Sequence, residues 1–145
     1  MDRKFLQYVE HLEPKFTKLL AMHPVTIESL PKEMPSVGIY LFSESGRHLY
    51  VGRSNRLRLR LQSHCRPGAK RHAATFAFRM ACIKVGKAKA TYKEGTSRAK
   101  LEGNPQFADI FRRAKERVRR MDIRFVEEIV PIRQALLEIY ISVML

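Results

Sequence analysis

Residues 37–64 constrain the fold of this chain more than any other stretch. Two strand-like runs, 37–43 and 47–52, flank the turn-type cluster Glu44-Ser45-Gly46. Glycine in such a cluster supplies the backbone angles that a tight turn requires, so the pattern predicts a β-hairpin.

The register of the hairpin depends on where its turn is centred. A turn centred on Ser45 places Tyr40 opposite Tyr50. Because side chains alternate faces along a strand, the two tyrosines share one face with Gly38 and Gly52 beside them. Glycine marks positions where a ligand or another backbone comes close. The other face is expected to enter the core through Ile39, Leu41, Leu49 and Val51.

The segment after the hairpin, residues 55–64, is predicted to be a helix. Leu57 and Leu61 lie one turn apart on its buried side. Arg60 and His64 are also one turn apart, on an adjacent stripe. The pattern therefore predicts that the phenol pair of the sheet and a guanidinium–imidazole pair of the helix converge.

These residues resemble the GIY-YIG nuclease family. Gly38-Ile39-Tyr40 stands for the first signature, and Tyr50-Val51-Gly52 stands for the second with Val in the place of Ile. The family's helical arginine falls ten residues after the second tyrosine, at Arg60. Some restriction-type members carry a histidine four residues later, which is His64. The resemblance thus implies a catalytic set of Tyr40, Tyr50, Arg60 and His64.

The predicted fold class is α+β, with a small central, mostly antiparallel three-stranded sheet flanked by helices. The hairpin supplies two strands and residues 122–130 the third. A chain of 145 residues is expected to form a single domain. Residues 1–35 are then an N-terminal helical extension and linker, and residues 36–145 are the nuclease core.

Apolar periodicity and proline positions predict the remaining helices. One spans residues 2–22, where Pro14 starts a second piece or makes a kink, and another spans residues 69–85. Pro105 starts a third helix and Pro131 opens the last one, which is apolar nearly all round and is expected to be buried. Residues 86–103 are polar and basic, and we expect a loop with one helical turn that either contacts DNA or is simply solvated.

The positive charge is concentrated in the middle of the chain. Of the net +14, residues 53–120 carry twenty Lys or Arg against four acidic residues, and the rest carries eight against ten. A local concentration of this kind indicates a phosphate backbone as partner, and without a broad aromatic face it argues against a membrane surface. The residues expected to contact nucleic acid are Arg53, Arg56, Arg66, Lys70, Arg71, Arg112 and Arg113.

The remaining composition indicates an intracellular protein. Cys65 and Cys82 lie seventeen residues apart without a CxxC pair, which predicts reduced thiols and no zinc site. No apolar run reaches the roughly eighteen residues that span a bilayer, and the N-terminus lacks an apolar signal core. We therefore expect a cytoplasmic protein without a membrane partner, and an association with the nucleoid is compatible with this location.

One acidic residue of the last helix is the candidate metal ligand. Glu138 lies on a narrow polar stripe with Gln134 and Ser142. A carboxylate in an apolar helix is costly to bury, so it needs a metal, a basic partner or an opening to solvent. In the family a Glu on the helix after the third strand is the single protein ligand of a divalent cation, and by resemblance Glu138 takes that place. Glu127 and Glu128 are the alternatives and are expected to pair with arginines instead.

The resemblance implies a metal-dependent endonuclease that hydrolyses double-stranded DNA with one Mg²⁺ or Mn²⁺ ion per site and leaves 5′-phosphate ends. Tyr40 is the general base that the family favours, although a phenol has an ordinary pKa of about 10 that must be lowered. His64 is the alternative base, because imidazole titrates near neutrality unaided.

A second hypothesis is a basic DNA- or RNA-binding module that keeps the scaffold without catalysis.

The apolar last helix runs to Leu145 without a C-cap, where restriction-like members continue into a polar tail. This departure predicts a shortened chain, a member without those groups, or a homodimer whose partner covers the apolar surface.

Overall fold

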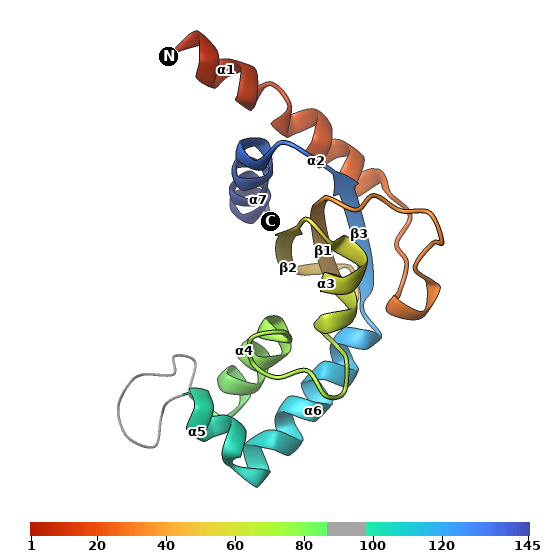
Figure 1. Cartoon of the computed structure of the whole chain (residues 1–145), viewed down its shortest axis with the longest axis vertical. Coiled ribbons are helices and arrows are strands. Elements are labelled where there is room, and N and C mark those ends of the chain that lie inside the picture. The colour runs from red at the N-terminus through yellow and green to blue at the C-terminus, as the bar shows by residue number, and fades with distance from the viewer. Residues whose placement is uncertain (87–97) are drawn as a thin grey trace. The chain divides into compact units, whose positions relative to one another are not determined.

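The computed structural model describes residues 1–86 and 98–145 (Figure 1). The chain divides into two compact units, a first unit of Met1–Leu59 with Met121–Leu145 and a second unit of Arg60–Arg120. Among the described residues, no helix combines the length and the apolar character needed to cross a membrane. Most of the predicted basic loop lies outside the described residues, and its described end forms the predicted helical turn as α5 (Arg98–Gly103).

A three-stranded antiparallel sheet forms the centre of the first unit and confirms the predicted fold class. Its order is β2-β1-β3, with β1 at Gly38–Glu44, β2 at Arg47–Ser54 and β3 at Asp122–Glu127. Ser45 and Gly46 form the two-residue hairpin turn with φ of 51° and 77°, the positive values that such a turn needs. Because β1 is the middle strand, β2 is an edge strand of the sheet that residues 1–86 and 98–145 form.

The predicted register of the hairpin is wrong by two residues. Tyr40 pairs with Gly52, and Phe42 pairs with Tyr50. One residue of the error arises because the turn is centred between Ser45 and Gly46, and the other because an irregularity between Phe42 and Ser43 adds a residue to β2. An even shift keeps the two tyrosines on one face as predicted. Leu49, expected in the core, lies at the irregularity and is exposed.

The core of the first unit lies on the other face of the sheet. There Ile39 and Leu41 of β1 pack with Leu137 and Ile141 of α7 (Pro131–Met144). Figure 1 shows α2 (Leu12–Ala21) and α7 beside the sheet, and residues of α2 complete the same core. The predicted N-terminal helix is divided, because α1 (Arg3–Val9) ends before α2 begins. Pro14 lies in the first turn of α2, where proline is tolerated.

The last helix is less buried than its composition predicts. Leu137 and Ile141 of α7 are fully buried, whereas Ile132, Ile139 and Val143 are exposed. The apolar residues all round α7 therefore make two faces, of which one packs on the sheet.

The connectors of the first unit are short and hydrogen-bonded. Val25 forms an isolated bridge with Ile123 of β3, and η1 (Ile27–Ser29) follows it. The helix α3 (Leu57–Ser63) begins two residues later than predicted, and the backbone N–H of Leu57, in its first turn, donates to Ser36 O at 2.8 Å. Its apolar positions Leu57 and Leu61 are fully buried, as predicted.

The second unit is a small helical body built around three phenylalanines. It contains α4 (Thr75–Lys84), α5 and α6 (Pro105–Arg119). The α4 helix starts six residues later than predicted, because residues 70–74 form turns first. Pro105 opens α6 as predicted, after the N-cap Asn104. The ring of Phe78 meets those of Phe107 and Phe111 edge-on at centroid distances of 5.3 and 5.4 Å.

Candidate active site

Tyr40 and Tyr50 form a pair on the sheet face opposite the core of the first unit. Their ring centroids lie 6.3 Å apart at an interplanar angle of 31°. Tyr40 is 1% exposed and Tyr50 is partly exposed. The edge of Phe42 packs against the Tyr40 ring at 5.8 Å. Tyr40 is therefore fixed within the sheet layer, and Tyr50 is the phenol of this pair that solvent reaches.

The glycines of both signature triplets are required by close contacts. A Cβ atom at Gly52 would collide with the hydroxyl oxygen and Cζ of Tyr40. A Cβ atom at Gly38 would collide with the backbone carbonyl of Val126 in the neighbouring strand. Gly52 therefore creates the space for the Tyr40 ring, and Gly38 allows β1 and β3 to pair closely.

Glu138 forms an ion pair with Arg53. Its Oε2 atom lies 2.9 Å from Nε of Arg53, with the two side chains 32% and 46% exposed. In the register Arg53 faces Ile39, so it projects on the core face, opposite to the tyrosines. The carboxylate and the phenols thus belong to different faces of the sheet. Both groups are connected to the edge strand β2, because Tyr50 lies on this strand and Glu138 pairs with its Arg53.

The chemistry of Glu138 fits a hard divalent cation as a single protein ligand. A carboxylate oxygen is the ligand that Mg²⁺ prefers, with water and phosphate oxygens completing the octahedron. The ion pair occupies Oε2 through one guanidinium nitrogen and leaves Oε1 for another partner. Within residues 1–86 and 98–145, no group of three His, Cys, Asp or Glu side chains gathers as a ready-made metal cage.

Arg60 of α3 and His64, which directly follows α3, belong to the second unit. Neutral oxygen atoms hold the guanidinium of Arg60 there. Its Nη1 donates to Ala73 O at 2.9 Å, and its Nη2 donates to Thr75 Oγ1 at 3.0 Å. A longer contact of 3.5 Å joins Nη1 to Ser63 Oγ. None of these acceptors carries a charge, so the positive charge of Arg60 is oriented without being neutralised.

His64 is fully buried, and this changes its expected chemistry. Burial, together with the nearby Arg60 cation, lowers the pKa of His64 from 6.5 to about 3. Both causes act against the imidazolium form. His64 is therefore neutral at physiological pH and a weak proton acceptor, whereas the sequence alone suggested a group that titrates near neutrality.

The lowered pKa of His64 predicts a loss of stability in mild acid. Below the unfolded-state pKa of 6.5 the unfolded chain binds a proton that the folded chain does not take up until about pH 3. Stability therefore falls as the pH falls through this window. Lowering the pH from about 7 to about 5 should reduce the free energy of unfolding by about 2 kcal/mol through this residue. Urea unfolding at both pH values measures the change.

The matching variant is His64→Gln, which cannot titrate. It should lose most of the difference between the two pH values, whatever its absolute stability. An unchanged pH dependence in His64→Gln would show that other groups cause it.

The family is decided by a comparison of the whole chain. The model of the GIY-YIG catalytic domain matches residues 36–141. The chain belongs to the GIY-YIG family. No curated protein and no solved structure matches the chain. The match includes parts of both units and leaves the N-terminal helices outside.

Membership in the GIY-YIG family establishes the broad class of this protein. A GIY-YIG catalytic domain is a nuclease domain, so the chain is an endonuclease whose substrate is a nucleic acid. Tyr40, Tyr50 and Gly52 belong to the first unit with Glu138, whereas Arg60 and His64 belong to the second. The convergence of these groups at one phosphate stays a prediction.

The residues predicted to contact nucleic acid fall into two sets in this GIY-YIG domain. Arg56, Arg66 and Lys70 are exposed. The other four form ion pairs with carboxylates: Arg53 with Glu138, Arg71 with Glu102, Arg112 with Asp109 and Glu116, and Arg113 with Asp109. The pairs of Arg112 and Arg113 follow helical spacing, whereas those of Arg53 and Arg71 join distant segments. Phosphate contact by the second set must compete with an internal ion pair.

Within residues 1–86 and 98–145, Glu127 and Glu128 do not have the arginine partners that were expected. The carboxylate of Glu128 is buried and accepts a hydrogen bond from the backbone N–H of Val130 at 3.2 Å. The side chain of Glu127 is exposed, and its backbone carbonyl accepts a bond from Nζ of Lys15 at 2.5 Å. Glu128 thus has a structural role where α7 begins.

Lys115 is a buried cation of α6. Its Nζ donates to Pro67 O at 2.6 Å and to Ala69 O at 2.9 Å, and lies 4.5 Å from the Phe111 ring centroid. Burial lowers the pKa of Lys115. This lysine fastens the segment after α3 to α6, and only its position four residues after Phe111 could have suggested it.

Proposed function

We propose that this protein is a divalent-metal-dependent endonuclease that cuts double-stranded DNA and leaves 5′-phosphate and 3′-hydroxyl ends. Membership in the GIY-YIG family supports the reaction class. The observation that carries the residue assignment is the setting of Arg60, a positioned cation that keeps its full charge.

Arg60 is proposed to bind the scissile phosphate. Hydrolysis of a phosphodiester builds negative charge on the non-bridging oxygens as water attacks. A guanidinium offers paired donors that match two such oxygens. Because Ala73 and Thr75 hold Arg60 in place, little further ordering is needed when the phosphate arrives.

Tyr40 is proposed as the general base and Tyr50 as the group that orients the attacking water or the phosphate. The alternative base, His64, is disfavoured by its low pKa, since an efficient base has a pKa close to the working pH. Tyr40 is as buried as His64, so its assignment rests on the family resemblance. His64 is then a neutral, buried residue at the end of α3, whose backbone N–H donates to Arg60 O at 3.3 Å.

Glu138 is proposed to hold one Mg²⁺ or Mn²⁺ ion through its carboxylate. Such an ion, when bound, supplies counter-charge to the phosphate and assists the leaving oxygen. Arg53 would then release or share the carboxylate, because the ion and the guanidinium compete for the same charge.

One observation favours the second candidate, a non-catalytic nucleic-acid-binding module. The Arg53–Glu138 ion pair satisfies the carboxylate without any metal, so the presence of Glu138 in α7 does not by itself require a cation. The basic surface would serve binding equally well.

Nicking of supercoiled plasmid distinguishes the two candidates. With Mg²⁺ or Mn²⁺ the full chain should convert supercoiled plasmid to open-circular and linear forms, and chelation by EDTA should stop the reaction. Ligation of the products without prior phosphorylation would establish 5′-phosphate ends. Salt-dependent binding without turnover in either metal would support the binding module instead.

A further inference from the structure

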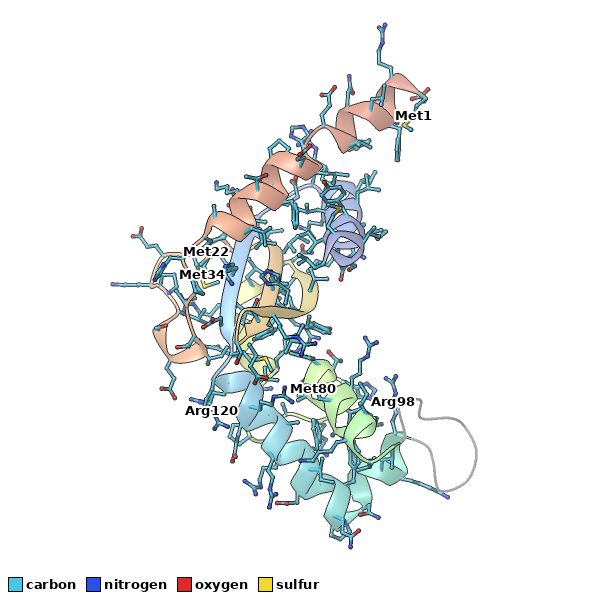
Figure 2. All side chains as sticks on the ribbon, turned by 180° about the vertical axis from the view of Figure 1, so that it is seen from behind. Met1, Met22, Met34, Met80, Arg98 and Arg120 are labelled. Carbon is cyan, nitrogen blue, oxygen red and sulfur yellow. The ribbon has the colours of Figure 1, made fainter. Side chains whose placement is uncertain are left out.

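A hollow of about 410 Å³ lies between α4 and α6 of the second unit. This volume is within the range of roughly 300–1,000 Å³ that is usual for small-molecule sites. Figure 2 labels Met80, which lies on α4 and lines the hollow. All lining residues are described and belong to the second unit: Met80, Ala81, Ile83, Lys84, Ile110, Arg113, Ala114 and Arg117.

The lining combines an aliphatic set with a cationic set. Met80, Ile83 and Ile110 are the larger apolar members, and Ile83 is 58% exposed. The thioether of Met80 adapts to flat ligands because the side chain is unbranched and polarizable. Lys84, Arg113 and Arg117 supply the positive charge. The hollow therefore suits a ligand that has a flat apolar part and an anionic group attached to it.

A nucleotide whose base is unpaired has this chemistry. An intact duplex offers phosphates but keeps its base faces stacked inside, so it cannot use the aliphatic lining. A base that is out of the stack can lie between apolar side chains while cations bind its flanking phosphates. The nucleic acid on which this endonuclease acts supplies such a ligand whenever it contains a bulge, a flap or a single-stranded end.

We infer that the hollow between α4 and α6 binds one unpaired nucleotide of the substrate and that the protein prefers nucleic acid with an unpaired base. This deepens the proposed function, on which it rests, by naming a substrate class. Arg113 is partly neutralised by Asp109 at 3.1 Å. Lys84 has no ion pair within residues 1–86 and 98–145, so it is the cation best suited to the phosphate.

Methyl NMR tests the site directly. The full chain, labelled at Met and Ile methyl groups, is titrated with adenosine monophosphate and, in parallel, with inorganic phosphate. The mononucleotide should shift the methyl signals of Met80, Ile83 and Ile110, whereas phosphate alone should leave the Met80 and Ile110 signals in place. Unmoved Met80 and Ile110 signals at saturating mononucleotide would overturn the inference.

Fluorescence anisotropy in EDTA tests the preference without cleavage. Three labelled duplexes are compared, an intact one, one with a single unpaired adenosine, and one with an abasic residue at the same bulge. The protein should bind the adenosine bulge measurably more tightly than the abasic bulge, because the abasic residue has no base to place against the apolar lining. The duplex with the abasic bulge controls for the bent backbone, because it has the same bulge without the base. Equal affinity for the two bulges therefore contradicts the inference.

Two exposed positions supply the variants. Ile83→Glu and Lys84→Ala should each abolish or reduce the preference for the adenosine bulge without unfolding the protein. Arg79→Ala is the matched control, because Arg79 is an exposed cation of the same helix outside the hollow. It should weaken binding to all three duplexes by a similar factor and keep the preference.

The outcomes separate this inference from the proposed function. If the protein nicks plasmid but binds both bulges with equal affinity, the proposed endonuclease function stands and the proposed nucleotide site is rejected. A preference for the adenosine bulge in a protein that never nicks DNA would retain the site and reject the catalytic proposal. Methyl shifts produced by an acidic peptide but not by the mononucleotide would assign the hollow to a protein partner instead.

Discussion

Replacing Arg60 by Ala should lower the rate of plasmid nicking by about 10³-fold, the size of effect seen when an arginine that stabilises a phosphoryl transition state is removed. The expected loss is large because Arg60 keeps its charge and is held by two fixed acceptors, Ala73 O and Thr75 Oγ1. Single-turnover nicking under saturating protein measures the chemical step, and thermal melting reports whether the fold is retained.

Graded substitutions separate the charge of Arg60 from its position. Arg60→Lys keeps the charge without the planar fork and should recover only part of the rate. Thr75→Val removes one acceptor of the guanidinium and should give a smaller loss than Arg60→Ala, mainly in the chemical rate rather than in binding. Thr75→Ser keeps the hydroxyl and should restore the rate. Full activity in Arg60→Ala would remove this residue from the mechanism.

The local pattern of residues 37–64 was sufficient to predict the hairpin, the shared face of the tyrosines and the buried leucines of α3. These features depend on alternation along a strand and on helical spacing, which a short sequence window contains. The register was wrong by one residue because the turn is centred between Ser45 and Gly46, and by another because the extra residue of β2 at Leu49 has no glycine or proline to mark it. Strand irregularities of this kind are set by the neighbouring strand rather than by local sequence.

The partners of Arg53 and Lys115 could not be predicted, because they lie far away in the chain, whereas the ion pairs of Arg112 and Arg113 follow the helical spacing of α6. Arg53 and Glu138 meet only when α7 packs on the sheet, and Lys115 is buried only because the segment after α3 folds onto α6. A basic helix predicts an exposed cationic surface on average. Which cation is withdrawn into the protein depends on the carbonyl groups that tertiary structure brings to it.

Burial also reverses a chemical prediction for His64. A sequence shows only the ordinary pKa of an imidazole, which favours a catalytic base or a phosphate donor. In the folded chain the same residue is buried beside a cation, and its pKa falls to about 3. The position one helical turn after Arg60 was predicted correctly, but the protonation state was not.

Replacing Glu138 by Gln should abolish metal-supported nicking, with a loss of about 10³-fold, because a bound cation stabilises the transition state by several kcal/mol. The fold should survive. The Arg53–Glu138 pair is about one-third to one-half exposed, and such pairs contribute only about 0–1 kcal/mol to stability. Mn²⁺ binding to the DNA-free protein, measured by electron paramagnetic resonance, should weaken in the same variant, a readout that does not depend on activity.

The ion pair allows a sharper test, because Arg53 and the cation compete for one carboxylate. Arg53→Gln should bind Mn²⁺ more tightly than the unmodified protein while binding DNA less tightly, since it removes both a competitor of the metal and a candidate phosphate contact. Glu127→Gln, which alters the exposed alternative acid at the end of β3, should leave Mn²⁺ binding unchanged. If Mn²⁺ affinity follows Glu127 instead, or if Glu138→Gln and Arg53→Gln bind Mn²⁺ equally well, Glu138 is only the partner of an arginine and the cation must be held elsewhere.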